Sequence, residues 1–445
     1  MRPRSVTGPL VLLAIGIFFL INNIRPDLIS LSRIADYWPF LVIGAGVIGL
    51  IEVLFHASRG AAPPPRPVAG AGIFWILILG IFLITVSRNR NFRFGPFDSP
   101  GISVFGSDYD YDVSASESPR GITRVVLDNL RGNLSVKGED GDIKVTGRKT
   151  VRAFNRNDAD RANQQSQVRV DRQGDVLFIR AEDFTGPRTP QISTDLDISV
   201  PPGVSLESRA RSGDLTVDGI DGTVGISAGR GDIRLNHIGG DVKVESTRGG
   251  EIHVTDVKGS VDLQGRGSDL QIEQIAGPVT INGDYGGTLE FHALAKPMHF
   301  SSSRTQFQLE AVPGTVTMDL GNMKLDNATG PVRFRTGVRD IEASGVSGAL
   351  DLNVDRGDIH VTVNKTPVPK IDIHTHNGDI GLSLPENAEF QLDGTTSQGD
   401  IDNEFGGGLH SESNGRASTI RGQVGNGPTV NIGTDRGSIS IRKIS

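Results

Sequence analysis

The sequence contains no cysteine and few aromatic residues. Without cysteine, the chain can form neither a disulfide nor a lipoprotein anchor. Aromatic residues make up 6% of the 445 residues, which is little for a large globular core but enough for a thin core of aliphatic side chains. The formal net charge is −7 and no basic, aromatic-rich stretch occurs. The sequence therefore predicts no nucleic-acid binding.

Residue patterns of common enzymes are also missing. The glycine-rich stretch Gly239-Gly240-Asp241 is not followed by Lys-Ser/Thr and a helix, so it indicates a turn rather than a phosphate loop. No nucleophile with a matching base is recognisable, and short regular units leave little room for a pocket. We expect no enzymatic activity, no cofactor and no small-molecule substrate. A polysaccharide-active β-helix enzyme is the least favoured hypothesis.

What the sequence does contain is a short internal repeat. An apolar residue recurs at regular intervals along the chain, and we call each of these places a marked position. Nearly every marked position follows Gly plus one small or acidic residue, and the next residue but one is also apolar. A fixed short period is typical of solenoids, and the alternation indicates strands with one face in water. The marked positions are Leu215, Val224, Ile233, Val242, Ile252, Val261, Leu270, Val279 and Leu289.

The units alternate in kind, so the true repeat is a pair. Every second marked position gives 215, 233, 252, 270 and 289, with spacings of 18, 19, 18 and 19 residues. Two short strands and two glycine turns fit this length. We therefore predict an all-β, single-chain parallel β-helix (β-solenoid) with 18–19 residues per coil. The pattern is looser between residues 295 and 340, and 158–167 is typical of a short exposed helix.

Three apolar runs precede the repeat, at about residues 8–24, 38–55 and 69–86. Each is long enough to cross most of a bilayer as a helix. The sequence predicts an α-helical membrane region over 1–87, a polar linker over 88–120, an irregular N-terminal cap over 121–204 and a regular solenoid over 205–445. The small residues Gly44, Ala45, Gly46 and Gly49 form a candidate helix-packing seam.

Two stretches carry a family resemblance. The run from Asp197 to Leu206 (DISVPPGVSL), followed by Ser212-Gly213-Asp214-Leu215, resembles a bacterial β-strand-repeat family of unknown function labelled "putative adhesin". The stretches from Gly8 to Asn23 and from Trp38 to Gly44 are similar to the membrane region of LiaI- and LiaF-type envelope-stress proteins. Together they imply a multi-pass protein of the bacterial cytoplasmic (inner) membrane, embedded in the lipid bilayer, with an extracytoplasmic solenoid.

A ladder of charged residues is the strongest local pattern. A carboxylate precedes the marked apolar residue in every second unit, and an arginine lies two or three residues before it. One interpretation is structural, an ion-pair and turn-capping ladder along one corner. The other is a strip that docks cell-wall glycan or an envelope protein. The residues are Arg211, Asp214, Arg230, Asp232, Arg248, Glu251, Arg266 and Asp269.

Two further patterns have simpler explanations. Asp372, His374 and His376 alternate on one strand face, but the two imidazoles are exposed and lack an organising partner, so the sequence predicts no metal site. Arg230-Gly231-Asp232 and Arg356-Gly357-Asp358 spell an integrin-binding tripeptide, which the repeat generates by itself. The favoured hypothesis is a membrane-anchored, non-enzymatic adhesin or envelope-surface binding protein. The alternative is an accessory regulator of cell-envelope stress signalling that acts through the membrane segment.

Overall fold

The computed structural model describes residues 106–128, 130–182, 184, 191–406 and 408–444. Beyond Gly106 they belong to one compact unit, Ser107–Ser445. The predicted spans at 8–24, 38–55 and 69–86 and the predicted seam from Gly44 to Gly49 lie outside the described residues. Among the residues that are described, no helix has the length and apolar character needed to cross a membrane.

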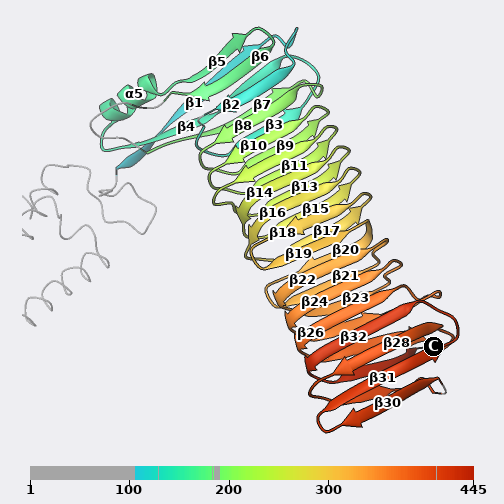
Figure 1. Ribbon diagram of the computed structural model, residues 1–445. Helices are drawn as coiled ribbons and strands as arrows, with labels where there is room; N and C mark the ends of the chain where they lie inside the picture. The colour runs from blue at the N-terminus through green and yellow to red at the C-terminus, as the bar shows by residue number, and fades with distance from the viewer. Residues whose placement is uncertain (1–105, 129, 183, 185–190, 407, 445) are drawn as a thin grey trace, which may run out of the picture. The chain divides into compact units, whose positions relative to one another are not determined.

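The middle of the unit is a two-sheet parallel solenoid (Figure 1). Odd-numbered strands from β9 to β17 form part of sheet A, and even-numbered strands from β8 to β16 form part of sheet B. Leu215 pairs with Ile233, followed by Ile252, Leu270 and Leu289, so each coil takes 18 or 19 residues, as predicted. The strands are β8 (Ser205–Ala210), β9 (Leu215–Ile220), β10 (Val224–Ala228), β11 (Ile233–Ile238), β12 (Val242–Ser246), β13 (Ile252–Val257), β14 (Val261–Gly267), β15 (Leu270–Ile275), β16 (Val279–Tyr285) and β17 (Leu289–Leu294).

The core lies between the two sheets. All nine marked apolar positions, and the apolar residue two places after each, are buried, which confirms the predicted alternation. At the glycine turns the coils approach too closely for a side chain. Gly231 has a φ of 128°, and a Cβ there would overlap the carbonyl oxygen of Gly213 in the preceding coil.

Each sheet A strand of these coils bends near its end through one left-handed residue. Gly219, His237, Asp256, Gln274 and Ala293 have φ between 53° and 75° and occupy equivalent places in successive coils. The bend breaks the period of two, so that residues three apart, such as Val217 and Ile220, both point into the core. The sequence pattern alone does not reveal this bend, because four of the five residues have side chains that disfavour a positive φ.

The N-terminal strands cover the first coil. In sheet A, β4 pairs antiparallel with β1 and β7, and β7 pairs parallel with β3. In sheet B, the β5–β6 hairpin lies beside β2. Helix α5 packs its Ala159 and Ala162 against Val151 of β4. The elements are β1 (Ser107–Glu117), β2 (Arg124–Asp128), β3 (Leu134–Gly138), β4 (Ile143–Ala153), α5 (Arg156–Gln165), β5 (Val168–Gln173), β6 (Val176–Ala181) and β7 (Gln191–Val200).

One part of the expected polar linker 88–120 is folded. The strand β1 pairs with β4 over its whole length, from Ser107 opposite Ala153 to Glu117 opposite Ile143. The reason is its alternating pattern, since Tyr109 and Tyr111 pack toward the cluster under α5. The Tyr111 hydroxyl donates to Asp160 at 2.6 Å.

One coil between residues 298 and 338 runs backwards, so the solenoid predicted over 205–445 is not uniformly parallel. β19 pairs antiparallel with β18 and β22, and β20 pairs antiparallel with β17 and β21. The Phe307 ring packs against those of Phe291, Phe300 and Phe334 in this coil, with ring centroids 4.9–5.9 Å apart. The strands are β18 (Met298–Ser301), β19 (Thr305–Leu309), β20 (Val312–Met318), β21 (Asn322–Asp326) and β22 (Val332–Val338).

The C-terminal strands do not stack in chain order. β32 lies between β26 and β28, and β33 lies between β27 and β29. The last coil of the chain therefore lies between the two coils that precede it in the sequence. The β30–β31 hairpin then closes the end of sheet B (Figure 1). The strands are β23 (Asp340–Ser344), β24 (Leu350–Arg356), β25 (Ile359–Thr362), β26 (Ile371–Asn377), β27 (Ile380–Pro385), β28 (Phe390–Thr396), β29 (Ile401–Asn403), β30 (Leu409–Asn414), β31 (Ala417–Val424), β32 (Thr429–Arg436) and β33 (Ile439–Ile444).

Candidate functional site

Three of the four carboxylates of the predicted ladder, those of Asp214, Asp232 and Asp269, cap turns along one corner. Asp214 Oδ1 accepts the main-chain N–H of Asp232 at 3.0 Å, and Asp232 Oδ1 accepts that of Glu251 at 3.0 Å. Asn133 does the same for Asp214, and Asp269 does it for Thr288. One step earlier, Asp195 accepts the N–H of Asn133 at 2.7 Å. We call this row the corner ladder, and at these places its side chains bond one coil to the next.

The corner ladder recurs near the C-terminal end. Asp340 accepts the N–H of Asp358 at 2.9 Å, Asp358 accepts that of Asp379 at 2.8 Å, and Asp379 accepts that of Ser438 at 2.7 Å. Asp358 belongs to one of the two Arg-Gly-Asp tripeptides, and its carboxylate is bonded within the corner. The Gly-Asp pattern therefore serves coil stacking here.

The arginines of the predicted ladder differ in their spacing from the turn glycines. Gly213 N–H donates to the Arg230 carbonyl, which sets Gly213 level with Gly231. Arg211 lies two residues before its glycine and Arg230 lies one before, so the two arginines occupy different levels of the turn. Arg234 also contacts the corner carboxylates, because its Nη2 lies 3.6 Å from Asp232 and 3.4 Å from Glu251.

A second kind of cap joins coils on another turn. Asp241 accepts both the N–H and the hydroxyl of Ser260, at 2.7 and 2.8 Å. Asp284 accepts the same two groups of Ser303, at 2.9 and 2.7 Å. In each pair, both hydrogen bonds lower the pKa of the carboxyl below its usual value, and the main-chain N–H has a larger effect than the hydroxyl.

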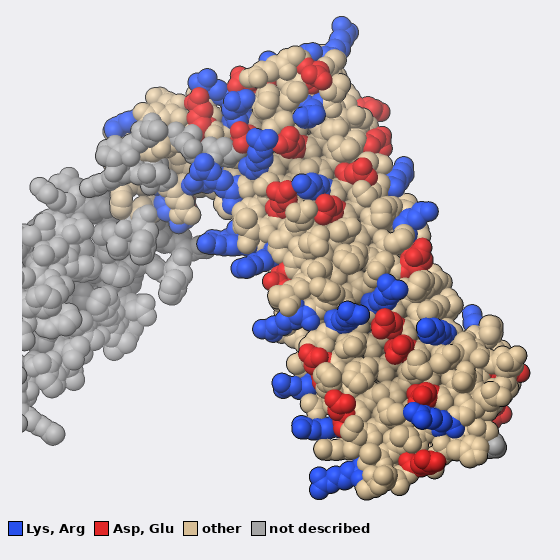
Figure 2. Space-filling model, viewed as in Figure 1, with Lys and Arg blue, Asp and Glu red and all other residues tan. Residues whose placement is uncertain are grey.

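The outer faces of both sheets carry polar side chains in register. In sheet A, the parallel pairing aligns Thr216, Arg234, His253, Gln271 and Glu290 in one row. Neighbouring strands lie about 4.8 Å apart, so this row, which we call the sheet A row, has a regular short repeat. Figure 2 shows Lys/Arg and Asp/Glu side chains interspersed from one end of the visible face to the other.

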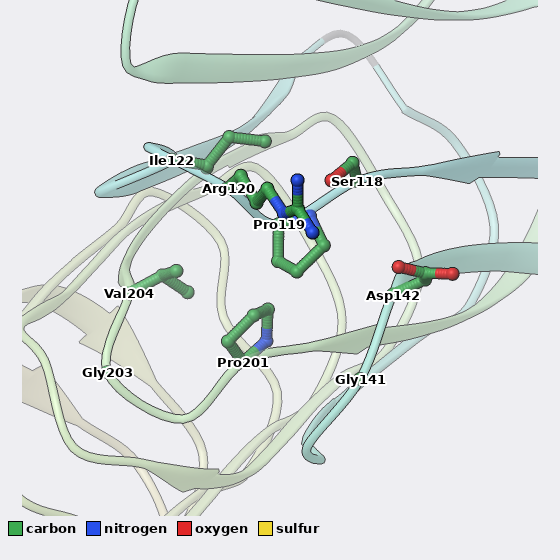
Figure 3. A pocket seen from close by; sticks show the side chains of 9 residues that line it. All are labelled: Ser118, Pro119, Arg120, Ile122, Gly141, Asp142, Pro201, Gly203 and Val204. Carbon is green, nitrogen blue, oxygen red and sulfur yellow. The ribbon is translucent and has the colours of Figure 1, made fainter.

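The described surface has hollows, two of which contain charged side chains. The larger, about 580 Å³, opens near the N-terminal end between the loop after β1, the β3–β4 turn and the β7–β8 turn (Figure 3). Its lining is mostly Pro, Gly and aliphatic, with Arg120 and Asp142 as the charged members. This is a poor set for chemistry, because few polar groups converge on it.

The smaller hollow, about 320 Å³, lies beside the reversed coil. Its lining includes Tyr285 and Arg339, whose Tyr Oη and guanidinium Nε and Nη1 are buried without a hydrogen-bond partner. Burial raises the pKa of Tyr285 to about 12 and lowers the pKa of Arg339. Unpaired buried polar groups of this kind cost free energy of folding.

The histidine pair that the sequence singled out has a partner that the sequence did not reveal. His376 Nδ1 lies 2.9 Å from Asp435 Oδ2 on the neighbouring strand β32. His374, His376 and Asp435 offer ligand atoms that all lie within 4.8 Å of one another. Asp372, the third residue of the predicted group, is not part of this cluster. A single polar residue 59 positions along the chain gives no local signal of this proximity.

Comparison with solved structures finds similar chains of low identity. A putative cell adhesion protein from Clostridium sporogenes is 10% identical, covering 76% of this chain and 100% of that one with a TM-score of 0.18. A putative adhesin from Bacteroides fragilis is 10% identical, covering 61% and 97% with a TM-score of 0.28. A putative lipid binding protein from Parabacteroides distasonis is 12% identical, covering 61% and 96% with a TM-score of 0.30. Scores this low support no inference about function.

Sequence comparisons place the chain in a family. No functionally curated protein matches it. Residues 110–442 match the family described as Toastrack DUF4097. The match runs from β1 to β33 and covers almost the whole described unit. The expected LiaF-like region over 1–87 lies outside this match. The chain therefore belongs to the Toastrack DUF4097 family.

Proposed function

We propose that this protein is a membrane-anchored, non-enzymatic binding protein of the bacterial envelope, with its solenoid on the extracytoplasmic side. The apolar runs at 8–24, 38–55 and 69–86 support the anchor. The resemblance of 197–206 to adhesin-like repeats supports the extracytoplasmic side.

The observation that carries the proposal is the register of the outer faces. Parallel pairing repeats a polar side chain at every coil of the sheet A row, for example Arg234, His253 and Gln271. A long surface with a fixed short repeat suits a ligand that is itself extended and repetitive. Mixed charge on the visible face favours a polar glycan or a protein over a polyanion.

Binding to isolated cell walls tests this proposal. We expect the full-length protein in detergent to sediment with purified wall glycan, and the triple variant Arg234→Ala, His253→Ala, Gln271→Ala to sediment less. The matched control replaces the equivalent outward residues Lys243, Asp262 and Thr280 of sheet B with alanine. Wall binding that is absent, or that the two triple variants lower equally, contradicts the proposed surface.

Membrane orientation is a separate test. A reporter that is active only outside the cytoplasm, fused after Ser445, should be active. If the reporter is inactive and protease reaches the solenoid only in opened membranes, the solenoid lies inside the cell. That result refutes envelope binding.

A second candidate function is regulation of envelope-stress signalling. The observation that favours it is the similarity of 8–23 and 38–44 to LiaI- and LiaF-type membrane regions, with the small residues Gly44, Ala45, Gly46 and Gly49 suited to helix packing. Replacement of 1–87 by an unrelated three-span anchor separates the two functions. Loss of the cellular phenotype supports regulation through the membrane helices, whereas its survival supports the solenoid surface.

A further inference from the structure

Two imidazoles and one carboxylate converge on the outer face of sheet B. His374 and His376 are alternate residues of β26, and their rings meet edge to face with centroids 5.2 Å apart. Asp435 on β32 faces His376, with 2.9 Å between Oδ2 and Nδ1. One ligand atom from each residue lies within 4.8 Å of the other two.

The surrounding backbone leaves space for this arrangement. The strand pairing sets His374 opposite Gly433 of β32. A Cβ at Gly433 would lie 3.0 Å from His374 Nδ1, so the ring rests where a side chain would otherwise stand. On the other side of β26, the register places Asp355 of β24 level with His376, which adds a second negative charge to this part of the face.

Three properties of the cluster suit a divalent transition metal. Imidazole nitrogen with carboxylate oxygen is a donor set for Zn²⁺ and similar ions, whereas Ca²⁺ prefers oxygen ligands alone. All three side chains are partly or fully exposed, so an ion can enter from solvent and torsional rotation can bring the donors to the roughly 2.0–2.2 Å that Zn²⁺ requires. Three protein ligands leave a fourth position for water or a partner's group.

We infer that His374, His376 and Asp435 form a Zn²⁺-class metal site on sheet B. Each residue supplies one ligand atom, and the metal replaces the proton shared between His376 and Asp435. The inference is independent of the proposed wall binding, because it concerns sheet B and needs no envelope ligand.

Isothermal titration with Zn²⁺ alone tests the site on the full-length protein in detergent, with any affinity tag removed. We expect one ion per chain, and at least a tenfold weaker affinity in His374→Ala, His376→Ala and Asp435→Asn. The matched control is His237→Ala, because His237 also bonds an aspartate, Asp218 at 2.8 Å, but contributes a single imidazole. This control should keep wild-type affinity.

Co²⁺ absorption provides a second readout that does not depend on heats. Bound Co²⁺ should give visible bands in the wild type and in His237→Ala, and lose them in Asp435→Asn, which keeps the size of the side chain. Ca²⁺ at the same concentration should not displace the ion. The inference is overturned if the wild type binds no Zn²⁺, if the three variants bind as the wild type does, or if Ca²⁺ displaces Zn²⁺.

Discussion

Asp232 in the corner ladder offers a direct test of what holds neighbouring coils together. Its Oδ1 accepts the N–H of Glu251 at 3.0 Å, and its own N–H donates to Asp214. Asp232→Ala leaves the part-buried Glu251 N–H without this acceptor. We expect a cost of about 1 kcal/mol, the lower part of the range for such a loss, because water reaches the corner.

Asp232→Asn separates the hydrogen bond from the charge. The amide oxygen can still accept, as Asn133 does for Asp214 at 3.0 Å in the first coil. The substitution also removes one member of a column of like charges, which relieves repulsion. We expect a change within about 0.5 kcal/mol.

Amide hydrogen exchange over 249–257 measures the effect locally, which suits a solenoid whose coils need not unfold together. A loss of about 1 kcal/mol should speed exchange roughly fivefold in Asp232→Ala. The control Asp262→Ala, whose carboxylate accepts from the side-chain amide of Gln264 at 3.2 Å and caps no main-chain N–H in the described part of the chain, should change little. If Asn speeds exchange as much as Ala, or if neither substitution does, the acceptor role of the corner ladder is refuted.

Three further predictions concern single positions. Gly231→Ala should lower stability by about 2 kcal/mol or more in thermal melts, because its φ of 128° and the neighbouring carbonyl exclude a Cβ. Gly225→Ala, whose Cβ would have its nearest neighbour at 4.0 Å, should be tolerated, and equal losses would contradict the steric argument. Arg339→Met should stabilise the fold by about 1 kcal/mol and so raise the melting midpoint, because it removes unpaired buried nitrogens. A lower midpoint would contradict this. Because Ser260 lowers the pKa of Asp241 in the fold, the stability from this contact is present above the unfolded-state pKa of about 4 and is lost as the pH falls further. Ser260→Ala removes the hydroxyl and keeps the main-chain N–H, so it should make melting midpoints somewhat less sensitive to acid, and an unchanged sensitivity would count against the hydroxyl contact.

The coil length and the core positions are predictable from the sequence because they repeat. Leu215, Ile233 and Ile252 stack directly, and any residue at an equivalent place meets the same environment. The reversed coil shows in the sequence only as a looser pattern between residues 295 and 340, because alternation does not record the direction of a strand. Direction depends on the tight turn at Ser302, whose Oγ accepts the N–H of Thr305, and side-chain alternation carries no information about it.

The candidate sites divide in the same way. The carboxylate positions of the corner ladder are visible in the repeated Gly-Asp pairs, and the structure places Asp214 and Asp232 in hydrogen-bond contact between coils. The place of the arginines is harder to predict, because Arg230 lies one residue before its glycine whereas Arg211 lies two before. Successive residues of a turn point in different directions, so a shift of one residue changes the direction of the side chain.

The sequence by itself determined the all-β solenoid, its 18–19-residue coil and its aliphatic core, because each of these is a local pattern repeated at fixed spacing. Only the tertiary structure decided the chain reversal near 300 and the insertion of β32 between β26 and β28. That insertion brings Asp435 to His376 across 59 residues. The choice of strand neighbour depends on which coils close the end of the solenoid, and strands with the same alternating pattern are interchangeable until they are packed.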